Sequence, residues 1–117
     1  MKTLQILMLN KKISCWDIST ASYDNKSFGV SSQDSSPYSI FFKSDGTKMY
    51  IVGSSGDKVY QYSLSTAWDI STDSYDNKSL GVSSQDSYPL GIFFKSDGTK
   101  IYMLGFNNKK VYQYSLS

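Results

Sequence analysis

The stretch of sequence that decides the fold covers residues 41–64 and reads FFKSDGTKMYIVGSSGDKVYQYSL. Apolar residues form continuous runs at 40–42 and 49–52, and over 58–64 they alternate with polar residues, which is a periodicity typical of β-strands. A short segment that contains glycine separates each run from the next, and glycine supplies the positive φ that tight hairpin turns require. The stretch therefore predicts three consecutive antiparallel strands.

The pattern occurs twice in the chain. Residues 16–65 align with residues 68–117 without a gap, and over these 50 positions 38 residues are identical and 12 differ. A period near 50 residues lies in the range of propeller blades, whereas most helical repeats are shorter. We therefore expect an N-terminal strand or extension over 1–13, a first repeat over 14–65 and a second repeat over 66–117.

Each repeat is expected to contain a fourth and more polar strand, at 26–30 in the first repeat and at 80–82 in the second. Burial should decrease from the first strand to the last, because the innermost strand of a blade lies between its neighbours and the outermost strand meets water. The expected fold class is all-β, made of β-propeller blades that are four-stranded antiparallel sheets.

A family resemblance rests on residues 42–52, FKSDGTKMYIV, and residues 59–64, VYQYSL. Together they resemble the core of WD40-type and YVTN-type propeller blades. The resemblance covers nearly the whole chain and implies two blades per chain. The chain departs from WD40 proteins in lacking their Gly-His pair and Trp-Asp dipeptide, and Ser44 and Ser96 replace the usual proline before Asp-Gly. By analogy, a WD40-like fold favours a scaffold for protein–protein contacts.

Two blades do not close a propeller, which has about four to eight. We therefore expect the ring to be completed by homo-oligomerisation, with a homotrimer giving six blades first, and a homotetramer giving eight blades or a filament next. The strand at 26–30 is then expected to complete the sheet formed by residues 90–116 of a neighbouring chain. Residues 4–9 fall where the third strand of a preceding blade is expected, a place that residues 110–116 of the neighbouring chain should already occupy. Three roles stay open for them: an added strand, the cover of an edge, or a disordered segment.

One rim of the predicted propeller carries the candidate binding residues. The loops at 35–39 and 87–91, and the turns at 54–57 and 106–109, are expected on this rim, and most differences between the repeats fall within them. Exposed aromatic rings beside amides and carboxylates suit a sugar or a protein surface. Ordinary packing between blades is the alternative. The candidates are Tyr38, Asp57, Tyr88, Phe106, Asn107 and Asn108.

Other residues are expected to have structural roles. The Asp-Gly turns lie on the opposite rim, and the tryptophans are predicted to pin the segment between strands to its blade, with a lectin site as the alternative. The pattern Thr66-x-x-Asp69, like Ser14-x-x-Asp17, predicts a turn resembling a capping box. The predicted anchors are Trp16, Trp68, Asp45, Gly46, Asp97 and Gly98.

Composition argues against several functions. The chain has no histidine, so it offers no imidazole base, no His-metal site and no Ser-His-Asp triad. We therefore expect no enzyme and no cofactor. We also expect no metal, because the paired aspartates lack the Asp-x-Asp-x-Asp-Gly spacing of a calcium loop and suit capping and turn roles. These are Asp17, Asp24, Asp34, Asp69, Asp76 and Asp86.

Charge and hydropathy also limit the partners. The net charge is +2, and the lysines are spread along the chain, which argues against nucleic acid. No segment approaches the ~20 apolar residues of a membrane span. Cys15 is the only cysteine, so no disulfide forms within the chain and the compartment stays open.

The expected function is a non-catalytic binding module, an oligomeric β-propeller that presents repeated shallow sites to proteins or, like a lectin, to glycans. Repetition would provide avidity without strong individual sites. The alternative is a structural or assembly protein whose ring or filament of blades is itself the product.

Overall fold

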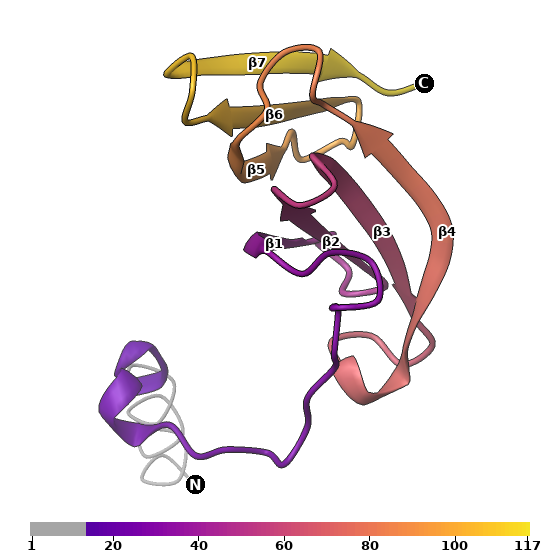
Figure 1. The fold of residues 1–117 in the computed structure, drawn as a ribbon. Coiled ribbons are helices and arrows are strands. Elements are labelled where there is room, and N and C mark those ends of the chain that lie inside the picture. The colour runs from indigo at the N-terminus through magenta and orange to yellow at the C-terminus, as the bar shows by residue number, and fades with distance from the viewer. Residues whose placement is uncertain (1–13) are drawn as a thin grey trace, which may run out of the picture.

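The computed structural model describes residues 14–117, which form two antiparallel β-sheets and three short 3-10 helices (Figure 1). The expected strand or extension over residues 1–13 lies outside the described residues. Residues 14–117 contain no α-helix, so the predicted all-β class is confirmed.

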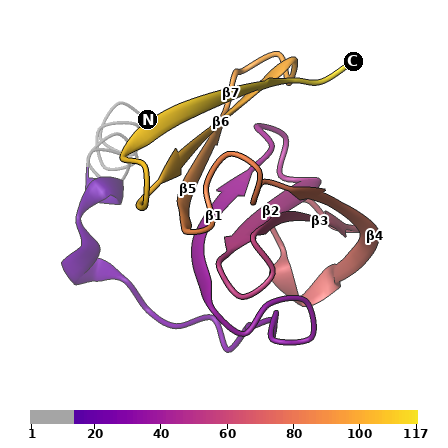
Figure 2. The ribbon, with the colours of Figure 1, turned by 45° about the horizontal axis from the view of Figure 1, so that its top comes forward.

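The two sheets follow one another along the chain. The first sheet contains β1 (Pro37–Phe42), β2 (Lys48–Gly53), β3 (Lys58–Leu64) and β4 (Asp73–Gly81), paired in that order. The second sheet contains β5 (Pro89–Phe94), β6 (Lys100–Gly105) and β7 (Lys110–Ser115). The 3-10 helices are η1 (Ser14–Trp16), η2 (Ile18–Thr20) and η3 (Ile70–Thr72). Figure 2 shows β5 beside β1, with β4 at the outer edge of the first sheet.

The predicted hairpin turns have the expected geometry where Asp-Gly occurs. Gly46 has φ 74° and Gly98 has φ 76°, and the amide of each donates a hydrogen bond of 2.8 Å to the carbonyl oxygen of the lysine three residues earlier. In the next hairpin the left-handed residue is Asp57 (φ 52°) in the first sheet and Lys109 (φ 54°) in the second. Gly56 is needed for another reason: a Cβ atom there would overlap the hydroxyl of Tyr60.

The core consists of two apolar clusters on opposite faces of the first sheet. The first cluster fills the space between the two sheets and contains Val52, Val59, Val82, Ile92, Phe94, Ile101 and Met103. The second cluster contains Met49, Ile51, Tyr60, Tyr62 and Leu64. Tyr60, Tyr62 and Leu64 thus lie on one face of β3, as the alternation over 58–64 predicts, and all three are buried.

The predicted decrease in burial from the first strand to the last is wrong for the first sheet. β2 and β3 are its most buried strands, while β1 contains only exposed and half-buried residues. Ile40 on β1 is exposed, although its counterpart Ile92 on β5 is buried. The difference arises because Ile92 packs against the first sheet, whereas no described sheet covers the equivalent face of β1.

The fourth strands also differ from the prediction. In the first sheet the outer strand covers nine residues, Asp73–Gly81, rather than the three expected. The second sheet has three strands instead of four, and residues 21–36, which include the predicted strand at 26–30, form no strand. In Figure 1 the indigo segment that carries η1 and η2 lies away from both sheets, at the opposite end of the view from β7.

Candidate functional site

Three of the predicted rim residues meet at the junction of the two sheets. The Tyr38 and Tyr88 hydroxyl oxygens are 2.5 Å apart, and the ring centroids of these residues are 5.5 Å apart. Phe106 packs edge-on against Tyr88, with 5.4 Å between ring centroids. All three side chains are exposed. We name them the aromatic cluster.

A β-bulge places Tyr38 in the aromatic cluster. Pro37 pairs with Gly53 and Ser39 pairs with Val52, so Tyr38 is an extra residue without a partner across the hairpin. Bulges of this kind redirect one side chain without ending the strand. The second sheet has the same bulge between Pro89 and Gly91, and its extra residue is Leu90. The two bulges thus have the same pairing pattern and differ in the side chain that they present.

A buried carboxylate holds the other two members of the cluster. Asp86 is 1% exposed and accepts hydrogen bonds from the backbone amides of Tyr88 at 2.8 Å, Asn107 at 3.3 Å and Asn108 at 2.8 Å. The amide of Phe106 donates to the carbonyl oxygen of Tyr88 at 2.9 Å. Burial alone would raise the pKa of Asp86, but the three amide hydrogen bonds outweigh it, so the pKa is lowered. The cluster therefore rests on a fixed base.

Asp34 has the same position in the first sheet and more partners. It is 1% exposed and accepts hydrogen bonds from the Ser36, Ser55 and Gly56 amides and from the Ser55 and Tyr60 hydroxyls. Burial raises the pKa of Asp34, yet these hydrogen bonds lower it to about 2. A Cβ atom at Gly53 would overlap this carboxylate, so glycine is required beside it.

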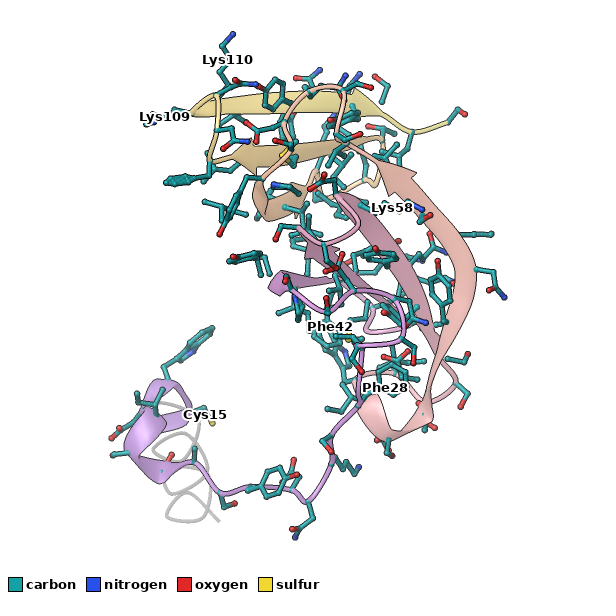
Figure 3. The ribbon with its side chains drawn as sticks, in the orientation of Figure 1. Cys15, Phe28, Phe42, Lys58, Lys109 and Lys110 are labelled. Carbon is teal, nitrogen blue, oxygen red and sulfur yellow. The ribbon has the colours of Figure 1, made fainter. Side chains whose placement is uncertain are left out.

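The remaining rim candidates are not part of the aromatic surface. The Asn107 side-chain amide donates to the Ser87 hydroxyl, and the Asn108 amide donates to the Gln85 carbonyl and the Tyr112 hydroxyl. Asp57 lies in the β2–β3 turn, where its carbonyl accepts the Val82 amide at 2.9 Å. Instead, Lys109 joins the cluster, with its Nζ 5.6 Å from the Phe106 ring centroid. Figure 3 shows Lys109 and Lys110 projecting from the β6–β7 turn.

The two predicted tryptophan anchors differ. Trp68 packs on Phe42 with 5.4 Å between ring centroids, covers the Cα of Gly46, and donates its backbone amide to the Gly46 carbonyl at 2.9 Å. Trp16 is 94% exposed, so within the described residues it anchors nothing. Trp68 covers the Asp-Gly turn of the sheet that precedes it in the chain, and no sheet among the described residues precedes Trp16. The other Asp-Gly turn, at Gly98 in the second sheet, is not covered by any residue over 14–117.

The two Asp-Gly turns are fixed by the same local contacts. The Asp45 carboxylate accepts the Thr47 amide at 2.9 Å and the Thr47 hydroxyl at 2.6 Å, and Asp97 does the same with Thr99 at 3.0 and 2.7 Å. The threonine hydroxyls are the main reason why the pKa of each aspartate is lowered to about 2.

The predicted capping-box turn has a different cap. Asp69, rather than Thr66, is the N-cap of η3, and its carboxylate accepts the Ser71 amide at 3.0 Å. Asp17 caps η2 in the same way through Ser19. An aspartate followed two residues later by serine forms this cap within one turn, so the distant hydroxyl is not needed.

Other features of the described residues bear on chemistry. No group of three or more Cys, Asp, Glu or His side chains with the arrangement of a metal site occurs over residues 14–117. None of the helices described in the structure has the length and hydropathy to cross a bilayer. A cavity of about 310 Å³ lies between the sheets, lined by β-strand residues that include Tyr50, Leu80 and Tyr114.

Comparisons with known proteins identify the fold. No protein-family model and no curated protein matches the chain. The chain is similar to a crystal structure from Bacteroides uniformis assigned provisionally as a 6-phosphogluconolactonase, with a TM-score of 0.57 and 17% identity, over 69% of this chain and 23% of that chain. The chain thus spans less than a quarter of that protein. At this identity the likeness shows the fold alone, which is two antiparallel sheets similar to part of a lactonase propeller.

Sequence reasoning missed two features of the site. The sequence predicts capping and turn roles for Asp34 and Asp86, whereas each is a buried acceptor that joins two loops. Lys109 was not a candidate, because its contact with Phe106 depends on the left-handed backbone of the turn. One signal is present in the sequence: residues 29–35, GVSSQDS, which contain Asp34, are identical to residues 81–87, which contain Asp86, although variable positions follow at once at 36, 38 and 39.

Proposed function

We propose that the chain is a non-catalytic binding module made of propeller blades, which presents the aromatic cluster on one rim. The observation that carries this proposal is the cluster itself, three exposed rings from both sheets, of which Tyr38 is placed by a β-bulge and Tyr88 and Phe106 by the loops that Asp86 joins. Rigid aromatic side chains provide large contact areas at a low cost in conformational entropy. They are enriched at the energetic centres of protein interfaces.

A protein surface fits this rim better than a glycan. A sugar site needs free polar groups beside its aromatic rings, and the amides of Asn107 and Asn108 are already engaged in hydrogen bonds within the loop. Lys109 remains near the rings and adds a positive charge. The favoured ligand is therefore a protein segment with apolar and acidic side chains, and a glycan is the second choice.

Several copies of the chain would place several aromatic clusters on one assembly. We favour a ring of three copies with six blades, followed by four copies with eight blades or a filament. Two features support self-assembly: the outer edge of β7 has no partner strand among the described residues, and residues 21–36 lie outside both sheets. Repeated weak sites on one assembly bind a multivalent partner with increased avidity.

Selection on defined libraries tests the role of the rim. Ligands would be selected on the wild-type chain from a displayed random-peptide library and, in parallel, from a glycan array, and then measured on Tyr88→Ala. Leu90→Ala is the matched control, because Leu90 is the bulged residue of the second sheet and lies outside the aromatic cluster. Loss of binding in Tyr88→Ala alone supports the proposal, whereas ligands that bind both variants equally contradict it.

The second candidate function is assembly itself, and the unpaired edge of β7 is the observation that favours it. In that case the ring or filament of blades is the product, and the rim has no ligand. Native mass spectrometry over a dilution series, together with electron micrographs, separates the two functions. Filaments in the micrographs with no ligand from either library would favour the structural role.

A further inference from the structure

We infer that residues 21–30 of one copy form the fourth strand on the open edge of β7 in a second copy, with Trp16 of the first copy seated on the Asp97–Gly98 turn of the second. This inference rests on the self-assembly in the proposed function and specifies the contacts that produce it. It follows from a comparison of the two copies of one segment, residues 14–30 and 66–82.

The first observation is that the same pair of strands occurs once paired and once unpaired. β4 pairs antiparallel with β3, so that Val59 lies opposite Leu80 and Ser63 lies opposite Ser74. The sequence of β7, KVYQYS, is identical to that of the first six residues of β3. Residues 22–27 are likewise identical to residues 74–79. The chain therefore contains an unpaired strand edge and a segment that forms no strand, and the twins of these two already pair with each other; the segment contacts its own first sheet and η3 through its last residues, among them Lys26, whose Nζ lies 3.0 Å from Asp69.

The second observation is that the unpaired segment has the backbone angles of its paired twin at Asp17 and Asn25, although the tryptophans differ, since Trp68 has φ 66° and Trp16 ends η1. Asn25 has φ 57° and Asn77 has φ 56°, so the left-handed residue that bends β4 is also present without a sheet. Asp17 and Asp69 cap their helices with φ of −97° and −104° and ψ of 104° and 99°. A segment that is already in its bound shape loses less entropy when it binds.

The third observation is an incomplete polar network on the second sheet. On the first sheet, the Asp76 carboxylate of β4 accepts hydrogen bonds from Gln61 at 2.8 Å and Ser63 at 2.8 Å, and lies 3.5 Å from Lys48. On the second sheet, Lys100 donates to Ser115 at 2.7 Å, just as Lys48 donates to Ser63 at 2.6 Å.

No carboxylate of the described residues reaches Lys100 and Ser115. The counterpart of Asp76 in the free segment is Asp24, which is exposed. Placing residues 21–30 on β7 in the register of β4 brings Asp24 to this position, so the free segment supplies the missing negative charge.

The fourth observation is that the Asp97–Gly98 turn is left uncovered by the described residues and matches the turn on which Trp68 packs. On the first sheet the Trp68 ring covers Gly46, and its amide bonds to the Gly46 carbonyl. Gly98 has the same backbone, with φ 76° against 74°, but open space where the ring would lie. Trp16 is the only other tryptophan of the chain. A second copy therefore provides the side chain that fits this turn.

The geometry requires a second copy rather than a fold-back of the same chain. Val82 packs between the two sheets, whereas Val30 packs against the cluster on the opposite face of the first sheet. Phe28 lies on that face as well, 5.6 Å from the Tyr62 ring (Figure 3). The segment before Val30 thus leads away from the second sheet, and β7 of the same copy lies on the far side of the molecule (Figure 1).

A designed disulfide tests the register. In a Cys15→Ala background, which takes the residue found at the equivalent Ala67, Ser22→Cys and Ser115→Cys are introduced together. Their twins, Ser74 and Ser63, lie directly opposite one another, and opposite residues of antiparallel strands are close enough for a disulfide. Ser63→Cys with Ser74→Cys is the matched control, expected to close within one chain.

The expected result of mild oxidation is a ladder of covalent oligomers from the Ser22→Cys/Ser115→Cys chain that collapses on reduction, with the control remaining a single chain. A ladder that ends at three or four chains indicates a closed ring. Mixing the two single variants should give only the mixed dimer. In addition, Asp24→Ala should weaken association about tenfold, since it removes a charged hydrogen-bond acceptor.

Two results would overturn the inference. A disulfide within one chain would show that the segment folds back on its own second sheet, and no disulfide while the control oxidises would show that the strands do not pair. Native mass spectrometry of the same samples separates this inference from the proposed function. Oligomers without the disulfide would remove strand exchange and leave self-assembly standing, whereas monomers at all concentrations would remove both.

Discussion

Residues 14–30 and 66–82 have nearly the same sequence but very different surroundings. Trp68 is 59% exposed and packs on Phe42, whereas Trp16 is 94% exposed. Tyr75 packs on the ring of Tyr62 at 5.4 Å, whereas its counterpart Tyr23 is exposed. The backbone angles of the two segments nevertheless agree at their helix caps and at Asn25 and Asn77, whereas only Trp68, with φ 66°, and not Trp16 is left-handed. Local sequence therefore sets the shape of the segment after the tryptophan, and the neighbouring sheet determines the tryptophan's backbone and the burial of the segment.

The two tryptophans should give the largest contrast. Trp68→Ala removes a ring that covers a turn and contacts Phe42, so the free energy of unfolding should fall by about 2 kcal/mol, roughly half the cost of truncating a fully buried tryptophan. Trp16→Ala should change it by less than about 0.5 kcal/mol in dilute solution. Urea denaturation at low protein concentration measures both. Equal losses would mean that Trp16 is anchored within its own chain.

The aspartates at equivalent positions should show an equally large contrast. Asp76→Ala leaves Gln61, Ser63 and Lys48 without their common acceptor, which should cost about 2 kcal/mol of stability at low concentration. Asp24→Ala removes no contact of the described chain and should leave that stability unchanged. A thermal melt of each variant, repeated at high concentration, reveals whether the loss in Asp24→Ala is confined to the assembled state.

The two segments differ in charge at one position, where the second has Asp73 and the first has Ala21. This difference predicts that the stability of the fold depends on pH. Burial, followed by the negative charge of Asp76, raises the pKa of Asp73 to about 6, and both of its buried carboxylate oxygens lack a hydrogen-bond partner over residues 14–117. Between pH 4 and 6 the unfolded chain loses this proton while the folded chain keeps it, so stability falls as the pH rises.

Asp73→Ala, which introduces the residue of the other segment, should therefore stabilise the fold at pH 7 by about 1 kcal/mol, a value reduced for partial exposure. It should have little effect at pH 4, where the carboxyl is protonated in both states. Denaturation curves at the two pH values provide the measurement. A variant that is less stable than wild type at pH 7 would contradict the raised pKa.

The two Asp-Gly turns should give the smallest contrast. A Cβ atom at Gly98 would meet no other atom of residues 14–117, so Gly98→Ala is disfavoured only by the positive φ of this residue and should lower the free energy of unfolding by about 1 kcal/mol. Gly46→Ala should cost about 1 kcal/mol more, because its Cβ atom would overlap the Trp68 ring. The difference between the two variants in a dilute urea titration isolates the contribution of the seated tryptophan. In the double variant with Trp68→Ala, the difference should disappear.

Much of the fold could be predicted from the sequence because short-range rules apply to it. Asp-Gly at 45–46 and 97–98 predicts a hairpin with a left-handed glycine, and both glycines have it. Alternation over 58–64 predicts which face of β3 is buried, and the structure agrees. The all-β class and the likeness to part of a propeller follow from the same strands.

The rest depends on contacts that no local pattern encodes. Gln-Asp-Ser is a polar sequence typical of exposed turns, yet Asp34 is buried because two loops and Tyr60 direct their donors at it. The pair formed by Tyr38 and Tyr88 required the bulge at Pro37 and the packing of two sheets, neither of which follows from residue types. The exposure of β1 likewise depends on which of its faces another sheet covers.

The matching of an unpaired segment with an unpaired edge makes the chain comparable to a heterobifunctional monomer in polymer chemistry, with one reactive group of each kind. Growth from such monomers has a direction, since every intermediate has one free group of each type at opposite ends. Ring closure is a reaction within one molecule, whose rate does not depend on concentration, whereas extension does. Protein concentration would then act as the control on product shape, with dilute conditions favouring rings and concentrated conditions favouring fibres.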